Sequence, residues 1–139
     1  MSQAVNFQTT NPAQLPDRAT EMQIAIQLDE ANNLAVAEYT TAGAIALGGK
    51  AYLKTGTAGA MTLKKPLAGP QLQGGNDGMI MKITALDAEA YVVTTPASGI
   101  NGADNTATFG GAIGDSITLE AFGGAWFATS LTGVTLSAV

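Results

Sequence analysis

The stretch that decides the fold is TLEAFGGAWFAT, residues 118–129 of a 139-residue chain. Two adjacent glycines, Gly123 and Gly124, separate two runs in which large residues alternate with small or polar ones. A two-residue turn between antiparallel strands needs positive φ angles, which glycine adopts without steric cost. The stretch therefore predicts a β-hairpin whose strands meet at the glycine pair.

The only tryptophan of the chain, Trp126, directly follows this turn. Strand alternation places Trp126 and Ala128 on one face, Ala125 and Phe127 on the other. We expect Trp126 to lie near Phe122 across the hairpin. A tryptophan here either covers the end of a core or contacts a partner, because its ring buries a large area at low entropic cost.

The same spacing of two recurs in earlier parts of the chain. It appears in residues 79–83 and again in residues 91–95, which predicts a second hairpin across the intervening LDAEA. Residues 22–28 and 34–36 show it on either side of DEANN and predict a further hairpin. A helix is the competing interpretation there, because Ala, Glu and Gln are good helix formers.

Glycine punctuates the middle of the chain. Five glycines fall within residues 43–64, a density that helices do not tolerate, so we predict short strands near 43–47, 50–55 and 60–64. The run PLAGPQLQGGNDG, residues 66–78, predicts a loop. No internal repeat is recognisable in the sequence.

Short strands with turns every 8–12 residues predict an all-β fold, either an antiparallel β-sandwich or a small barrel. The length allows one domain, which we place at residues 21–139. Residues 1–20 are mostly polar, contain two prolines and show no periodicity. They predict an extended N-terminal arm, which is either a disordered terminus or a strap laid across a neighbouring molecule.

The predicted core is thin. Hydrophobic residues make up 46% of the chain, but 25 of them are alanines, which bury little area. At ~25 cal/mol per Å² of buried apolar surface, such a core barely offsets a backbone entropy cost of ~1–2 kcal/mol per residue. Small domains often make up this shortfall by oligomerisation, so we expect a homo-oligomer.

Charge and hydropathy exclude several classes of partner. Charged residues make up only 12% of the chain and the net charge is −5, with no stripe of lysines and arginines, so we expect no nucleic-acid binding. No apolar run approaches the ~20 residues of a membrane helix. The polar N-terminus shows no signal peptide, so we expect synthesis in the cytoplasm and no membrane partner.

The residue types that carry most catalysis are missing. The chain has no histidine and no cysteine, which argues against nucleophilic triads and most metal sites. Most carboxylates fall in predicted turns, where Asp satisfies backbone donors. The loops GGNDGM and NGADN offer oxygen ligands for Ca²⁺, but neither has the closing Glu of a calcium loop. We therefore expect no enzyme, no metal and no cofactor.

Four segments carry a resemblance to a known class: LAGPQLQGGNDGMIMKIT, AYVVTT, ATFGGAIGDSITLEAFGGAWFATS and GVTL. A Gly-rich approach, a DG entering an apolar strand, a strand ending in threonines, and GDSITL followed by Trp after a glycine turn occur in this order. Over about residues 66–139, this layout resembles the small β-structured head-fibre and head-decoration proteins of tailed bacteriophages.

The resemblance implies a structural protein on the capsid exterior of a virion. Such a protein stands as a trimer on a local or quasi three-fold position and clamps adjacent major capsid proteins. The arm would then be the capsid strap, with Asn6, Phe7, Leu15 and Trp126 as candidate partner contacts. The alternative is a carbohydrate- or receptor-binding fibre or tail domain, for which an exposed Trp126 beside a polar groove would be the sign.

Overall fold

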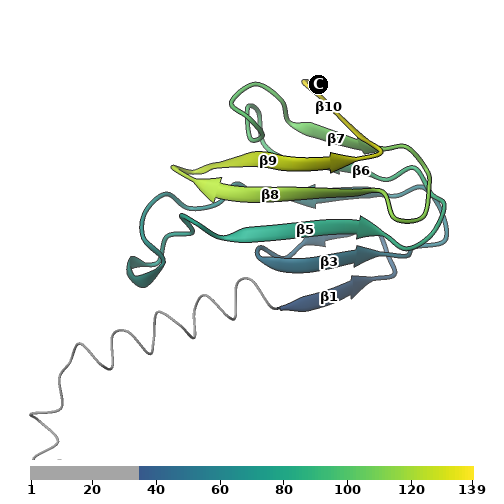
Figure 1. Ribbon diagram of the computed structural model, residues 1–139, viewed down its shortest axis with the longest axis horizontal. Coiled ribbons are helices and arrows are strands. Elements are labelled where there is room, and N and C mark those ends of the chain that lie inside the picture. Colours follow the sequence, from purple (N-terminus) through teal and green to yellow (C-terminus); the bar gives the residue numbers. More distant parts are fainter. Residues whose placement is uncertain (1–34) are drawn as a thin grey trace, which may run out of the picture.

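The computed structural model describes residues 35–139 as two stacked five-stranded β-sheets (Figure 1). The strands are β1 (Val36–Tyr39), β2 (Gly43–Ile45), β3 (Gly49–Leu53), β4 (Ala60–Leu63), β5 (Ile80–Ala85), β6 (Val92–Thr94), β7 (Thr106–Phe109), β8 (Ser116–Phe122), β9 (Ala125–Thr132) and β10 (Val134–Ser137). One short 3₁₀ helix, η3 (Gln71–Gln73), lies in the loop before β5. The all-β prediction is confirmed as a sandwich, because the sheets do not close into a barrel. The predicted arm, residues 1–20, lies outside the described residues.

The first six strands form a parallel coil. They alternate between the sheets, so that β1, β3 and β5 are neighbours in one sheet and β2, β4 and β6 are neighbours in the other. All four neighbouring pairs within these two sets are parallel. Each turn of this coil, residues 36–94, therefore contributes one strand to each sheet.

The last four strands complete both sheets in the antiparallel sense. β7 pairs with β6 and β10 with β7 in one sheet, while β8 pairs with β5 and β9 with β8 in the other. We call this part, residues 106–137, the return. The prediction of a purely antiparallel sandwich is thus right for the return and wrong for the coil.

The predicted hairpin across LDAEA is wrong, because β5 and β6 belong to different sheets. The side-chain faces were predicted correctly, since Met81, Ile83 and Val93 are all buried. A spacing of two identifies the buried face of a strand but not its neighbour. The hairpin predicted around DEANN lies largely outside the described residues, and its second part, β1, pairs in parallel with β3.

The turns of the coil differ in length, which explains why the sequence shows no repeat. Val36 pairs with Lys50 in the next turn, whereas Lys50 pairs with Lys82 in the one after. The longer turn contains the predicted loop, residues 66–78, which the structure confirms as non-strand apart from η3. The three short strands predicted between residues 43 and 64 are confirmed as β2, β3 and β4.

The core lies between the sheets and is formed by the inward side chains of both. The largest fully buried residues are Trp126, Tyr91, Phe109, Leu53, Met61, Leu63, Met81, Ile83, Ile100, Ile117, Leu119 and Val93. The rings of Tyr91 and Phe109 meet edge to face at 6.3 Å. The other buried apolar residues are Ile45, Met79, Val134 and the alanines Ala51, Ala85, Ala107 and Ala121, so residues larger than alanine form most of the core.

The β8–β9 hairpin forms as predicted. Gly123 and Gly124 have φ angles of 60° and 82°, as a type I′ turn requires. Trp126 is fully buried, and its indole N–H donates to the Lys64 carbonyl at 2.8 Å. The core-lid interpretation of Trp126 is therefore confirmed.

The expected proximity of Trp126 to Phe122 is wrong. Trp126 pairs with Ala121, whereas Phe122 pairs with Ala125. Directly paired residues of antiparallel strands share a face. The two-residue turn fixes this register, so Phe122 points away from the core and is 65% exposed.

Candidate interaction surfaces

The most connected polar cluster of the described residues lies between two corners of the coil. The Tyr91 hydroxyl donates to Asp87 Oδ1 at 2.6 Å and accepts from the Thr55 N–H at 2.8 Å. Asp87 Oδ2 accepts from the Gly56 N–H at 2.9 Å. The cluster thus joins the β3–β4 connection to the β5–β6 connection.

The pKa values of both titratable groups of this cluster are shifted away from neutral pH. The hydrogen bond from Tyr91 is the main cause that lowers the pKa of Asp87. Burial, followed by the hydrogen bond to Asp87, raises the pKa of Tyr91. Asp87 is therefore a carboxylate and Tyr91 a neutral phenol near neutral pH, and their geometry fastens the coil rather than preparing a proton transfer.

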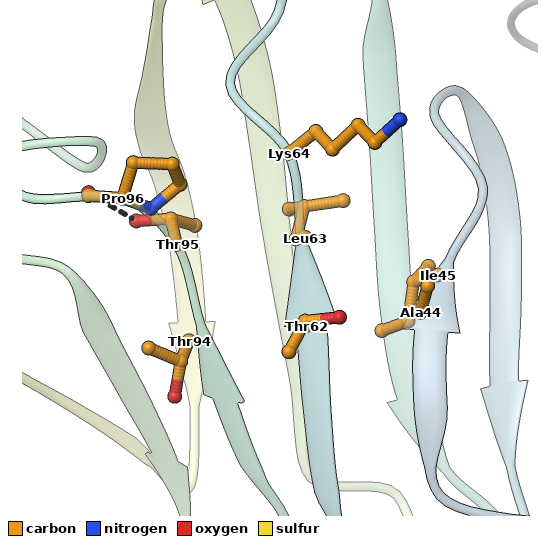
Figure 2. A pocket seen from close by; sticks show the side chains of 8 residues that line it. All are labelled: Ala44, Ile45, Thr62, Leu63, Lys64, Thr94, Thr95 and Pro96. Atoms are coloured by element: carbon orange, nitrogen blue, oxygen red, sulfur yellow. Dashed lines mark hydrogen bonds between the residues drawn. The ribbon is translucent and has the colours of Figure 1, made fainter.

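A hollow of about 320 Å³ lies at the carboxyl ends of three parallel strands (Figure 2). The residues that line it are Ala44, Ile45, Thr62, Leu63, Lys64, Thr94, Thr95 and Pro96. Its lining contains no carboxylate, and the Thr95 hydroxyl is already engaged with the Pro96 carbonyl at 3.1 Å. The Lys64 side chain extends from the end of β4 on the side of β2. This lining offers threonine hydroxyls and one ammonium group, but no acid–base pair.

One end of the sandwich carries a group of exposed apolar side chains. Loop 66–78, the start of β5 and the β8–β9 turn all lie at this end (left in Figure 1). Their exposed large apolar residues are Leu67, Leu72, Ile80, Phe122 and Phe127. We call these five residues the tip surface. Exposed apolar groups that gather at one place are typical of interaction sites.

Three hydrogen bonds hold the segments of the tip surface together. The Asp77 carboxylate accepts from the Gly123 N–H at 2.8 Å. The Gly78 N–H donates to the Ala121 carbonyl, and the Asn76 side-chain oxygen accepts from the Leu67 N–H, both at 2.7 Å. The loop is therefore fixed against the hairpin, and the apolar side chains are presented from a defined backbone.

Alternation along β8 and β9 explains why two phenylalanines face outward. Trp126 and Ala121 point into the core, so their neighbours Phe127 and Phe122 point to the other face of the sheet. Glu120 pairs with both Ile80 and Phe127, and it places one charge among the apolar groups.

The four predicted partner contacts remain predictions. Asn6, Phe7 and Leu15 lie outside the described residues. Trp126 is fully buried, so its ring offers no surface to a partner in this arrangement. The outward Phe122 and Phe127 were missed as candidates, although the alternation that turns Trp126 inward already implied the orientation of Phe127.

Within residues 35–139, no group of three or more acidic, His or Cys side chains is arranged to hold a metal ion. No helix in that range has the length and apolar character needed to cross a membrane. No protein-family model matches the chain, and no curated protein matches its sequence.

Proposed function

We propose that the chain is a structural virion protein that decorates the exterior of a tailed-phage capsid. In this proposal it is made in the host cytoplasm, binds the major capsid protein as a trimer and stabilises the shell without catalysis. The observation that carries the proposal is the tip surface, five exposed apolar side chains on a rigidly connected end of a β-sandwich. The sequence resemblance over about residues 66–139 supplies the class of partner.

Burial of apolar side chains is the binding mechanism that the tip surface supports. Phe122 is 65% exposed and Leu67 is 63% exposed, so both have area to lose on contact. Removing an apolar side chain from water contributes ~1.5–3 kcal/mol when burial is complete. Three copies in a trimer would bind adjacent capsid subunits with a high effective concentration, so weak single contacts give firm attachment.

The charge of the chain supports the same placement. The net charge of −5 disfavours contact with packaged DNA and suits an exterior position. The N-terminal arm, residues 1–20, would add a strap across a neighbouring subunit, with Asn6, Phe7 and Leu15 as its candidate contacts.

The test is binding to heads assembled from the major capsid protein encoded in the same genome. The wild-type chain should sediment with the heads. The double variant Phe122→Ser/Phe127→Ser should bind the heads at least about tenfold more weakly than the wild type, because two exposed rings are lost. Ile113→Ser is the matched control, since Ile113 is 71% exposed but lies in the β7–β8 connection rather than at the tip. Failure of the wild-type chain to bind such heads would overturn the proposal.

A truncated chain separates the contributions of arm and tip. Deletion of residues 1–20 should leave a folded body and weaken attachment if the arm is a strap. Unchanged binding of this truncation would assign the attachment to the body alone.

The alternative of a carbohydrate- or receptor-binding domain depended on an exposed Trp126. The ring is fully buried, so it provides no platform on which a sugar stacks. Near the exposed rings Phe122 and Phe127 lie two carboxylates, Glu120, which pairs with Phe127, and Asp77, which already accepts from the Gly123 N–H. The decoration role is therefore the function that the described surfaces support best.

A further inference from the structure

Two edge strands lie on the same side of the sandwich. The sheet edges of the described chain are β1 and β9 in one sheet and β10 and β2 in the other. β9 and β10 are consecutive and separated only by Gly133. Figure 1 shows both at the top of the molecule. We call the side formed by residues 129–137 the open side.

The first half of the β9 edge is already covered by a loop. The Trp126 N–H donates to the Gly99 carbonyl at 2.9 Å, and the Trp126 carbonyl accepts from the Asn101 N–H at 2.8 Å. The Asn101 side-chain oxygen also accepts from the Ala128 N–H at 2.9 Å. These bonds occupy both outward backbone groups of Trp126 and the N–H of Ala128, and the loop itself covers this part of the edge.

The second half of β9 lacks such a cover. Residues 130–132 pair with residues 116–118 of β8, and within residues 35–139 no hydrogen bond joins them to any other segment on the far side. A shift of register at Thr118 and Leu119 precedes this half. All four residues from Thr129 to Thr132 are exposed, although the first half of the strand contains the buried Trp126.

The uncovered half of β9 lacks the charged side chains and the proline that often protect a sheet edge, although it is short and follows the register shift. Edges are normally blunted by charged side chains, by proline, by short length or by a bulge. β1 carries Glu38, and β2 has only three residues. From Ala121 to Val139, by contrast, the chain contains no charged residue and no proline. Such an edge is a template for a further strand.

We infer that a second copy of this chain docks on the open side and adds a strand of its own open side to residues 129–132. An uncharged segment meets its own copy without like-charge repulsion, whereas β1 would bring Glu38 near a second Glu38. Leu131 is 45% exposed, so the contact would also bury apolar area.

This inference does not depend on the capsid proposal. A chain that self-associates through the open side but fails to bind heads would retain the inference and lose the proposed function. A chain that binds heads as an oligomer, and whose folded Leu131→Lys variant associates like the wild type, would retain the proposed function and lose the inference.

The experiment is sedimentation velocity of the full-length chain over a range of concentrations. The wild type should form a discrete oligomer. Leu131→Lys places a charge on the uncovered edge and should weaken association about tenfold or more. Val36→Lys is the matched control, because Val36 is 65% exposed on β1, the opposite edge of the same sheet, and its association should equal that of the wild type.

A second variant guards against an effect on folding. Thr129→Lys introduces the same charge at an exposed position of the same half-strand. Far-ultraviolet circular dichroism identifies which variants are folded. Weaker association in the folded variants, with Val36→Lys unaffected, supports the inference. A monomeric wild type, or a folded Leu131→Lys or Thr129→Lys variant that associates like the wild type, overturns it.

Discussion

The coil and the return reach the same two sheets by different means. In the return, β8 and β9 are consecutive strands, and the turn at Gly123 and Gly124 sets their register. In the coil, sheet neighbours such as β3 and β5 are separated by a strand of the opposite sheet. Local turn chemistry can therefore specify the hairpin, whereas the coil depends on contacts between successive turns.

Those contacts lie where the coil passes from one sheet to the other. Tyr91, Asp87 and Thr55 join two successive corners. Within the first turn, the hydroxyl of Tyr39 on β1 accepts a hydrogen bond from the Ala46 N–H just after β2, at 2.8 Å. The coil thus uses tyrosine hydroxyls, which act across the structure, where the return uses glycine φ angles. Four predictions measure how far this difference extends.

The largest effect is expected at the point where the return closes over the coil. Trp126 belongs to β9 but donates its indole N–H to the carbonyl of Lys64, just after β4. Trp126→Ala should lower the free energy of unfolding by ~3–5 kcal/mol, because a fully buried ring is lost. Urea denaturation followed by circular dichroism measures the change.

Phe127→Ala is the control for this prediction. Phe127 is the next residue on the same strand but is 42% exposed, so its loss should cost about 1 kcal/mol or less. Equal effects at the two positions would show that the hairpin does not close the core through Trp126.

The second effect concerns the corners of the coil. Tyr91→Phe keeps the buried ring but removes the hydroxyl that joins Asp87 and the Thr55 N–H. The loss should be ~1–3 kcal/mol, because two polar groups lose a partner and one of them is charged. Thermal and urea unfolding both report it.

Tyr52→Phe provides the matched comparison within the coil. Tyr52 is half-buried on β3, and none of the hydrogen bonds found in residues 35–139 involves its hydroxyl. Its removal should change stability by about 0.5 kcal/mol or less. A Tyr91→Phe variant as stable as Tyr52→Phe would mean that the corner cluster does not fasten the coil.

These contrasts show what the sequence could and could not reveal. The β8–β9 hairpin was predictable because Gly123, Gly124 and their flanking alternation lie within twelve residues. The separation of β5 from β6 was not, because alternation looks the same whether the chain turns back or crosses to the other sheet. What distinguishes the two is the contact of Asp87 with Gly56, which lies in a different turn of the coil.

The tip surface, too, contains residues whose orientation was predictable from the sequence and residues whose orientation was not. The outward orientation of Phe127 follows from a buried Trp126 and strand alternation. Leu67 and Leu72 lie in a loop without periodicity, so only the hydrogen bonds of Asp77 and Asn76 reveal that they face the same end as the hairpin.

The third prediction is a pH dependence that belongs to the coil. The pKa of Asp87 is lowered chiefly by the hydrogen bond from Tyr91, so its contribution to stability is present above the unfolded-state value of about 3.9. That contribution is lost as the pH falls through the lower folded-state pKa. Asp87→Asn should therefore flatten the acid limb of a plot of unfolding free energy against pH.

The alkaline limb of the same plot of unfolding free energy against pH depends on Tyr91. The pKa of Tyr91 is raised by burial and by Asp87, so its contribution is present below the unfolded-state value of about 10 and is lost as the pH rises above it. Tyr91→Phe should reduce both limbs. Acid limbs of equal steepness in the wild type and Asp87→Asn would place the acid sensitivity at another carboxylate.

The smallest effect is expected at glycines with positive φ in the two regions. Gly123 in the hairpin has φ 60° and Gly56 at a coil corner has φ 77°, and an added Cβ meets no atom within 4 Å at either position. Asparagine tolerates this backbone conformation. It is also the preferred partner of a following glycine in a type I′ turn, and Gly124 provides that glycine.

Gly123→Asn should therefore be neutral or stabilise the fold by up to ~0.4–1 kcal/mol, because asparagine restricts the backbone of the unfolded chain more than that of the folded turn. Gly56→Asn lacks the hairpin preference and should be a few tenths of a kcal/mol less favourable. Differential scanning calorimetry of the two variants resolves such a difference as a shift in melting temperature. If the coil corner gained as much as the hairpin, turn chemistry would direct both regions, and the tyrosine cluster would not be needed to explain how the coil is specified.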